Sequence, residues 1–188
     1  MAMNSVLKQQ ISEAVSTLQA GGVIAYPTEY CFGFGCDPRN EAAIERLLAI
    51  KQRKREQGVI VITANLAQVQ SYANIESLEC AEQIKRSWPG PNTWLLPVSD
   101  SVSTWVRGTH NTLAVRIPDH QVCQELCESF GHAIVSTSAN RHGQEALLSY
   151  QSVLQEFDRE LDYIIDANVG GEQSASTIRH AVTGEQIR

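Results

Sequence analysis

The chain has 188 residues, of which 43% are hydrophobic and 19% charged, and it carries a formal net charge of −6. This length and composition predict one globular domain with a sizeable core, and the acidity argues against avid, non-specific nucleic-acid binding, which needs many cations. The sequence contains no apolar run of 18 residues, so we expect no membrane span. The start lacks the pattern of a secretory signal, and the odd set of five cysteines fits the reduced thiols of a cytoplasmic protein.

Helix-like and strand-like segments alternate in the first half of the chain. Apolar residues at helical spacing predict a helix over about 7–18, which Gly21 and Gly22 end. The run 23–26 suits a buried strand, and Pro27 should end it because proline cannot donate to a sheet ladder. A helix over about 43–50, capped by Asn40, and a buried strand over 59–62 follow.

The segment after the first strand is unusual for a loop. Thr28 and Glu29 lie beside three aromatic residues and two glycines, Gly33 and Gly35. Glycines at alternate positions let a backbone approach a ligand closely, and the aromatic side chains can wall a pocket that excludes water. A strand followed by a Gly-containing turn under an aromatic cluster explains the segment equally well, because Gly-x-Gly alone is a weak signal.

A dense basic segment follows the second helix. Lys51, Arg53, Lys54 and Arg55 fall within five positions of an otherwise acidic chain, which suggests a local anion site. Lysine binds phosphate as a point charge, and arginine offers two parallel donors to phosphate or carboxylate. A solvated helix end is the alternative, since the helix dipole favours cations at a C-terminus.

The second half of the chain continues the alternation. One or two helices are expected over about 65–87, strands over 93–98, 112–117, 133–135 and 163–165, and further helices over about 119–130 and 149–158. Asp119 would cap the helix over 119–130. Cys123 and Cys127, one turn apart on it, are expected to be buried rather than to bind a metal. The pattern predicts an α/β fold, a single domain with an open, twisted, mixed sheet flanked by helices.

Polar clusters fall at strand ends, where open α/β sheets bind ligands. Ser136 to Asn140 places three hydroxyls and an amide after a strand, and Ser176 and Thr177 form a weaker cluster of the same kind. Such groups can donate to phosphate or ribose oxygens, although a helix cap or a Ser/Thr turn is the alternative. Arg116, near the end of its own strand, is a further candidate.

Six short motifs follow one another along the chain. They are Pro-Thr-Glu…Phe-Gly-x-Gly, Lys-x-Arg, Trp-Pro-Gly-Pro-x-Thr, Leu-Ala-Val-Arg, Ser-Thr-Ser-Ala-Asn and Ser-Thr-Ile-Arg. From about residue 8 onward, their order resembles the YrdC-like family, the threonylcarbamoyl-AMP synthases. The resemblance implies one YrdC-like domain over 1–188, of the short single-domain type.

The resemblance also implies an enzyme, a nucleotidyltransferase. Family members combine L-threonine, bicarbonate and ATP into threonylcarbamoyl-adenylate and pyrophosphate, for N6-threonylcarbamoyladenosine formation at tRNA position 37. Mg²⁺ would arrive with ATP, without a dedicated metal site in the protein. The product would pass to the threonylcarbamoyl-transferase proteins, and any tRNA contact would be weak.

Individual residue roles follow from the same resemblance. The catalytic residues would be Lys51, Arg53, Ser138 and Asn140. Threonine would be bound by Thr28, Arg116 and Ser136, with Arg116 pairing its carboxylate. The nucleotide would be bound by Lys51, Arg55, Thr112, Ser138, Asn140, Ser176 and Thr177.

Two positions depart from the family pattern. Lys54 stands where members usually have a proline after Lys-x-Arg, which predicts a more mobile loop. Tyr30 stands where a small residue is common, which bears on the shape of the threonine pocket.

Two other functions stay open at the level of sequence. A non-catalytic module that binds tRNA or double-stranded RNA would explain the basic segment but not the net acidity. A phosphosugar enzyme would need an acidic metal cluster, for which Glu29 alone is too little. Pyrophosphate release that depends on both threonine and bicarbonate separates the synthase from a binding module.

Overall fold

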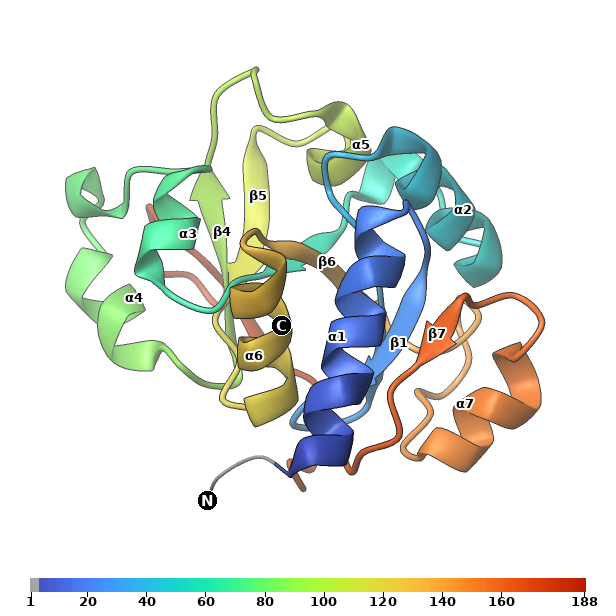
Figure 1. Cartoon of the computed structure of the whole chain (residues 1–188). Coiled ribbons are helices and arrows are strands. Elements are labelled where there is room, and N and C mark those ends of the chain that lie inside the picture. The colour runs from blue at the N-terminus through green and yellow to red at the C-terminus, as the bar shows by residue number, and fades with distance from the viewer. Residues whose placement is uncertain (1–3) are drawn as a thin grey trace.

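An eight-stranded mixed sheet organises the structure, a computed structural model that describes residues 4–188 (Figure 1). The strands lie in the order β7-β1-β2-β6-β3-β5-β4-β8. They are β1 (Ile24–Pro27), β2 (Phe32–Gly35), β3 (Ile60–Ile62), β4 (Asn92–Pro97), β5 (Thr112–Arg116), β6 (Ile134–Ser138), β7 (Tyr163–Ile164) and β8 (Thr177–His180).

Helices cover both faces of this sheet. They are α1 (Ser5–Gln19), α2 (Glu41–Lys51), α3 (Leu66–Gln70), α4 (Ala81–Ser87), α5 (Thr104–Arg107), α6 (Gln121–Phe130) and α7 (Tyr150–Phe157), with the 3₁₀ turns η1 (Arg55–Gln57) and η2 (Ile75–Ser77). Among residues 4–188, no helix combines the length and the apolar character that a membrane crossing requires.

Helices α1 and α6 lie side by side on one face of the sheet (Figure 1). Helix α1 contributes Ile11 and Leu18 to the core there, and α6 contributes Leu126 with Cys123 and Cys127. These residues share a face because positions three and four apart in a helix lie above one another. The two cysteines are fully buried, which confirms the expectation that they are core residues of a helix.

A larger core fills the opposite side of the sheet. Ile44 and Leu47 of α2 pack there together with Trp94 of β4. Asn40 begins α2 as expected, since its side chain accepts the backbone N–H of Ala43 at 3.1 Å. The burial of these apolar side chains from water is what fixes α2, and the basic segment that follows it, against the sheet.

Strand β6 joins the two halves of the sheet. Its residues Ile134 to Ser136 pair with β3, whereas Thr137 and Ser138 pair with β2, both in antiparallel register. The polar end of β6 therefore stands at the seam between the half-sheets. The strand is longer than expected, because its backbone continues to pair through the hydroxyl residues.

One segment expected to be a loop is a strand, and a further strand follows Ser176. Phe32–Gly35 forms β2, the antiparallel partner of β1, because Phe32 and Phe34 both enter the large core. The cluster beginning at Ser176 leads directly into β8, which pairs in parallel with β4.

The expected cap of α6 is also wrong. The residue before α6 is His120, and it makes no side-chain capping bond. Asp119 instead donates its backbone N–H to Glu29 at 2.8 Å. The carboxylate of Glu29, which is distant in sequence, thus accepts a hydrogen bond from the backbone just before α6.

Candidate functional site

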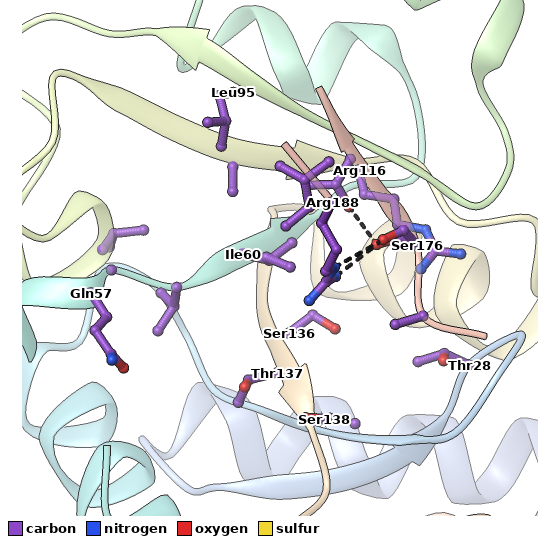
Figure 2. A pocket seen from close by; sticks show the side chains of 18 of the residues that line it. Thr28, Gln57, Ile60, Leu95, Arg116, Ser136, Thr137, Ser138, Ser176 and Arg188 are labelled. Atoms are coloured by element: carbon purple, nitrogen blue, oxygen red, sulfur yellow. Dashed lines mark hydrogen bonds between the residues drawn. The ribbon is translucent and has the colours of Figure 1, made fainter. Parts of the chain in front are cut away.

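A cavity of about 310 Å³ opens over the middle strands of the sheet (Figure 2). Ile60, Ala114 and Leu95 pair across β3, β5 and β4 and form part of its lining. Their chain neighbours Val61 and Val115 belong to the core behind the sheet, as the alternation of strand side chains requires. The volume is in the range of cavities that bind small molecules.

Most of the residues assigned from the sequence lie together in this cavity. Figure 2 shows Thr28 and Arg116 toward one end and Gln57 toward the other, with Ser136 and Ser138 between them. The assigned residues that line the cavity are Thr28, Arg53, Thr112, Arg116, Ser136, Ser138 and Ser176.

Arg116 is held at the cavity wall by two protein acceptors. Its Nε donates to the backbone oxygen of Gly90 at 3.0 Å, and its Nη2 donates to Glu29 Oε1. Glu29 is only 4% exposed, and its Oε1 is the same atom that accepts the Asp119 N–H. A buried ion pair thus connects the β1–β2 turn, the end of β5 and the start of α6.

Arginines give another part of the cavity a basic wall. Arg53 Nη2 donates to the backbone oxygen of Gly58 at 2.8 Å, and its buried Nε has no acceptor in the described residues. Arg188 donates to the backbone oxygen of Ser176 through Nε at 3.3 Å and Nη2 at 3.1 Å (Figure 2). Burial and the nearby Arg188 cation lower the pKa of Arg53. Neither arginine has a carboxylate partner within residues 4–188, so the pair favours an anionic ligand.

Lys51 lies behind the cavity rather than in it. It ends α2, is only 3% exposed, and donates to the backbone oxygens of Ser138 and Asn140 and to Asn140 Oδ1 at 2.8 Å. Burial and the nearby Arg53 cation lower its pKa to about 8. The alternative interpretation, that Lys51 is a solvated cation at a helix end, is therefore wrong. Its side chain is buried and holds the 138–140 segment in place. A direct contact between Lys51 and phosphate stays a prediction.

Asn140 shares this arrangement. Its Oδ1 also accepts the Ser138 hydroxyl at 2.7 Å, and its Nδ2 donates to the backbone oxygen of Gln144. Asn140 is absent from the cavity lining, whereas Ser138 belongs to it. The amide therefore orients the lining hydroxyl.

Two other assigned residues lie outside the lining. The guanidinium carbon of Arg55 lies 3.9 Å from the ring centroid of Trp105, and Arg55 also donates to Thr104. The hydroxyl of Thr177 donates to Asn92 Oδ1 at 2.9 Å. Both side chains are occupied by contacts within the protein.

Hydroxyl groups complete the polar lining. Thr28 Oγ1 donates to the backbone oxygen of Cys31 at 2.8 Å and closes the turn between β1 and β2. The Ser176 and Thr93 hydroxyls share a hydrogen bond of 2.8 Å. Burial raises the pKa of the lining Cys31 thiol to about 11, so this thiol stays protonated near neutral pH.

Sequence reasoning missed several lining residues. Arg188 reaches the cavity because the backbone of Ile178 pairs with Ile187 and Arg188, and no local pattern announces that pairing. Gln57 and His110 also line the cavity without belonging to a recognisable motif. Tyr30, noted as a departure from the family pattern, lies in the wall as well.

The described residues 4–188 contain no group of three or more His, Cys, Asp or Glu side chains arranged to hold a metal ion.

Known proteins resemble this chain in sequence over nearly its whole length. The sequence profile of the Sua5/YciO/YrdC family, described as telomere recombination, matches residues 16–188. A threonylcarbamoyl-AMP synthase of Vibrio cholerae is 43% identical over 184 residues, covering 97% of this chain and 98% of the relative. One of Pseudomonas aeruginosa is 45% identical over 175 residues, covering 93% of this chain and 94% of the relative.

A solved structure agrees with these sequence relatives. The crystal structure of P. abyssi Sua5 complexed with L-threonine matches with a TM-score of 0.84 and 32% sequence identity, covering 90% of this chain and 50% of that one. The likeness confirms the α/β fold with an open mixed sheet. The chain therefore belongs to the Sua5/YciO/YrdC family.

Proposed function

We propose that this protein is an L-threonylcarbamoyladenylate synthase. The observation that carries the proposal is one cavity that holds an oriented arginine, Arg116, as well as the neighbouring arginines Arg53 and Arg188. An amino-acid carboxylate and a nucleotide phosphate each suit such a cation, and adenylation requires the two substrates to meet. Support comes from two relatives named threonylcarbamoyl-AMP synthase and from the threonine bound to P. abyssi Sua5.

The proposed reaction forms two bonds. The threonine amine attacks the carbon of bicarbonate, and loss of water leaves a carbamate. A carbamate oxygen then bonds to the α-phosphorus of ATP, while the bond from that phosphorus to the oxygen bridging to the β-phosphorus breaks and pyrophosphate leaves. Such chemistry depends on in-line positioning and charge neutralisation rather than on a side-chain nucleophile, and it needs shelter because water destroys the carbamate and the mixed anhydride.

In this proposal, different arginines and hydroxyls of the cavity bind different substrates. Arg116 pairs with the threonine carboxylate, and Thr28 and Ser136 contact the polar groups of the same substrate. Arg53 approaches a phosphate or the reacting carbamate, with Arg188 beside it. All five residues line the cavity.

The nucleotide takes the remaining polar lining. Thr112, Ser138 and Ser176 face the cavity and would contact ATP directly. Lys51 and Asn140 would act on the nucleotide through the Ser138 segment that they hold. Arg55 and Thr177 receive no direct contact, because both lie outside the lining.

Mg²⁺ enters this proposal with ATP. Glu29, the carboxylate nearest to Arg116, is already bonded to that arginine, so the triphosphate itself would hold the ion, as is common for Mg²⁺. We further propose that the product is formed in the cytoplasm and passed to threonylcarbamoyl-transferase proteins, for N6-threonylcarbamoyladenosine formation at tRNA position 37.

Pyrophosphate release tests the function directly. With ATP and Mg²⁺, we expect turnover that requires both L-threonine and bicarbonate. Serine should be a poor substrate rather than an inactive one, because one methyl contact discriminates by only about 1–3 kcal/mol. Pyrophosphate release that ignores threonine, or its absence with all three substrates, contradicts the proposal. In the latter case, nanomolar tRNA binding would favour the RNA-binding module.

A further inference from the structure

Glu29 is a buried carboxylate with one fully used oxygen and one unused oxygen. It follows Thr28 in the turn between β1 and β2. Its Oε1 accepts from Arg116 Nη2 and from the backbone N–H of Asp119, whereas its Oε2 is buried without a partner in the described residues. Burying a charged carboxylate is costly, so this arrangement calls for a reason.

The Glu29 carboxylate binds only one part of the Arg116 guanidinium. A guanidinium has five N–H groups, and two of them are used, one by the Gly90 backbone oxygen and one by Glu29. Within residues 4–188, the other three have no protein acceptor, and none of the guanidinium nitrogens is among the buried polar atoms that lack a partner. Because Arg116 lines the cavity, the unused end of its guanidinium is available to a ligand there.

The turn that carries Glu29 is itself fixed. The backbone N–H of Gly170 donates to the Thr28 oxygen at 3.0 Å, and that of Glu172 donates to the Glu29 oxygen at 2.9 Å. A Cβ added at Gly170 would lie 3.0 Å from the Cα of Glu29 and 3.3 Å from His120 Cδ2. The segment after β7 therefore packs tightly on the turn and limits where the carboxylate can lie.

We propose that Glu29 is the positioning residue of the amino-acid carboxylate site: it orients Arg116 so that the free end of the guanidinium faces the substrate. This inference rests on the proposed function, since it assigns Arg116 to the threonine carboxylate. Arginine side chains have many rotamers, and fixing one before the ligand arrives removes that ordering cost from binding. Glu29 itself does not touch the substrate.

The asymmetry of the two oxygens allows geometry to be separated from charge. Glu29→Gln keeps an acceptor oxygen for both bonds of Oε1 and replaces Oε2, which has no partner, by an NH2 group. This variant lacks the negative charge of Glu29, which competes with a substrate carboxylate for Arg116. Positioning therefore predicts that Glu29→Gln binds L-threonine within about threefold of the wild type, whereas Glu29→Ala loses at least tenfold.

Calorimetric titration with L-threonine, L-threoninamide and ATP tests the inference. Threoninamide lacks the carboxylate, so Glu29→Ala should weaken its binding by less than threefold and leave ATP binding within twofold. Glu29→Ala combined with Arg116→Ala should bind threonine no more weakly than Arg116→Ala alone, since the two residues act as one unit. Glu172→Gln removes an exposed carboxylate from a residue whose backbone N–H bonds to the Glu29 oxygen, so it serves as the matched control and should equal the wild type.

Several results would overturn the inference. Equal losses for all three ligands in folded Glu29→Ala would assign Glu29 to general stability, and wild-type threonine affinity would remove any role. A tenfold loss in Glu29→Gln would mean that charge, not orientation, matters. If Glu29→Ala does not fold, Glu29→Met fills the same space without an acceptor and carries the same prediction.

The inference and the proposed function fail separately. If the wild type releases pyrophosphate with threonine and bicarbonate but Glu29→Ala binds threonine normally, only the positioning role is lost. If no pyrophosphate appears yet the wild type prefers threonine to threoninamide through Glu29 and Arg116, the positioning role stands and the synthase assignment is lost.

Discussion

Lys51 is a buried cation that makes no ion pair within residues 4–188. Three oxygen acceptors surround its amine, two of them from the backbone. They favour the ammonium form, because only that form has three N–H donors. Burial opposes this and lowers the pKa to about 8. The side chain therefore fastens α2 to the end of β6 with a charge that can be removed at moderately alkaline pH.

Lys51→Ala should impair both function and folding. We expect a ten- to hundredfold loss in ATP affinity or turnover, corresponding to about 1.5–3 kcal/mol for charged hydrogen bonds, together with a lower melting temperature because buried oxygens lose their donors. Pyrophosphate assays and thermal melts measure the two effects. Lys54→Ala, at an exposed lysine nearby, is the control. Unchanged kinetics and stability would show that the hydrogen bonds of Lys51 to residues 138 and 140 are dispensable.

The pKa of Lys51 also predicts a pH dependence. As the pH rises through about 8, the folded protein loses the Lys51 proton and one of the three hydrogen bonds, so kcat/KM for ATP should fall. The free energy of unfolding should instead increase with pH. Between about 8 and the ordinary value of 10.5, the unfolded chain holds more protons, so the contribution of this group rises with pH.

Lys51→Met tests this assignment, since it lacks the titrating group. Its residual activity should show no alkaline decline near pH 8, whereas Lys54→Ala should keep the decline. A decline that persists in Lys51→Met would assign the titration to another group.

At the scale of elements, β2 carries two glycines in different surroundings. A Cβ at Gly35 would lie 2.7 Å from Tyr26 Cε1 and 2.8 Å from the backbone oxygen of Val135. At Gly33 the nearest atoms, including Ser136 Oγ and Thr28 Cγ2, lie at 3.5 Å. Packing therefore requires a glycine at position 35, whereas Gly33 only borders the cavity.

Gly35→Ala should therefore destabilise the protein by about 1–3 kcal/mol, as overpacking does. Gly33→Ala should stay within about 0.5 kcal/mol of the wild type but reduce threonine-dependent turnover, since its methyl group would border the cavity beside Thr28. Urea unfolding and pyrophosphate assays of both variants check this. The prediction is wrong if the two variants lose similar stability.

Local signals in the sequence were sufficient for most helices. Asn4, Asn40 and Ser149 cap α1, α2 and α7 through side-chain bonds, and apolar spacing located their buried faces. Strand β2 was missed because two glycines in four residues are typical of a loop. Only the partner strand β1 and the core around Phe34 make that segment a strand.

The site was predictable as far as motifs reach. Thr28, Arg116 and Ser138 lie in motifs and line the cavity. Arg188 could not be placed, because its position depends on backbone pairing with Ile178. Lys51 was expected to face solvent or phosphate, and its burial depends on β6, which is distant in sequence.

At the scale of the whole molecule, the net charge of −6 limits contact with RNA. Lys54 is exposed, and Arg55 is stacked on Trp105. We expect weak tRNA binding that falls with added salt and weakens further in Lys54→Ala. Fluorescence anisotropy at two salt concentrations measures both. Nanomolar affinity at physiological salt would contradict the expectation.

Because β6 pairs with both half-sheets and presents Ser136 and Ser138 to the cavity, a substrate bound as proposed would contact the strand that joins the two halves of the domain. A ligand that binds only the folded state raises the free energy of unfolding, by about 2.7 kcal/mol at roughly a hundred times its Kd. Amide hydrogen exchange through global unfolding should then slow equally in β1 and in β4, on opposite sides of the seam. Substrate supply in the cell would thus set how long each copy of this protein resists proteolysis.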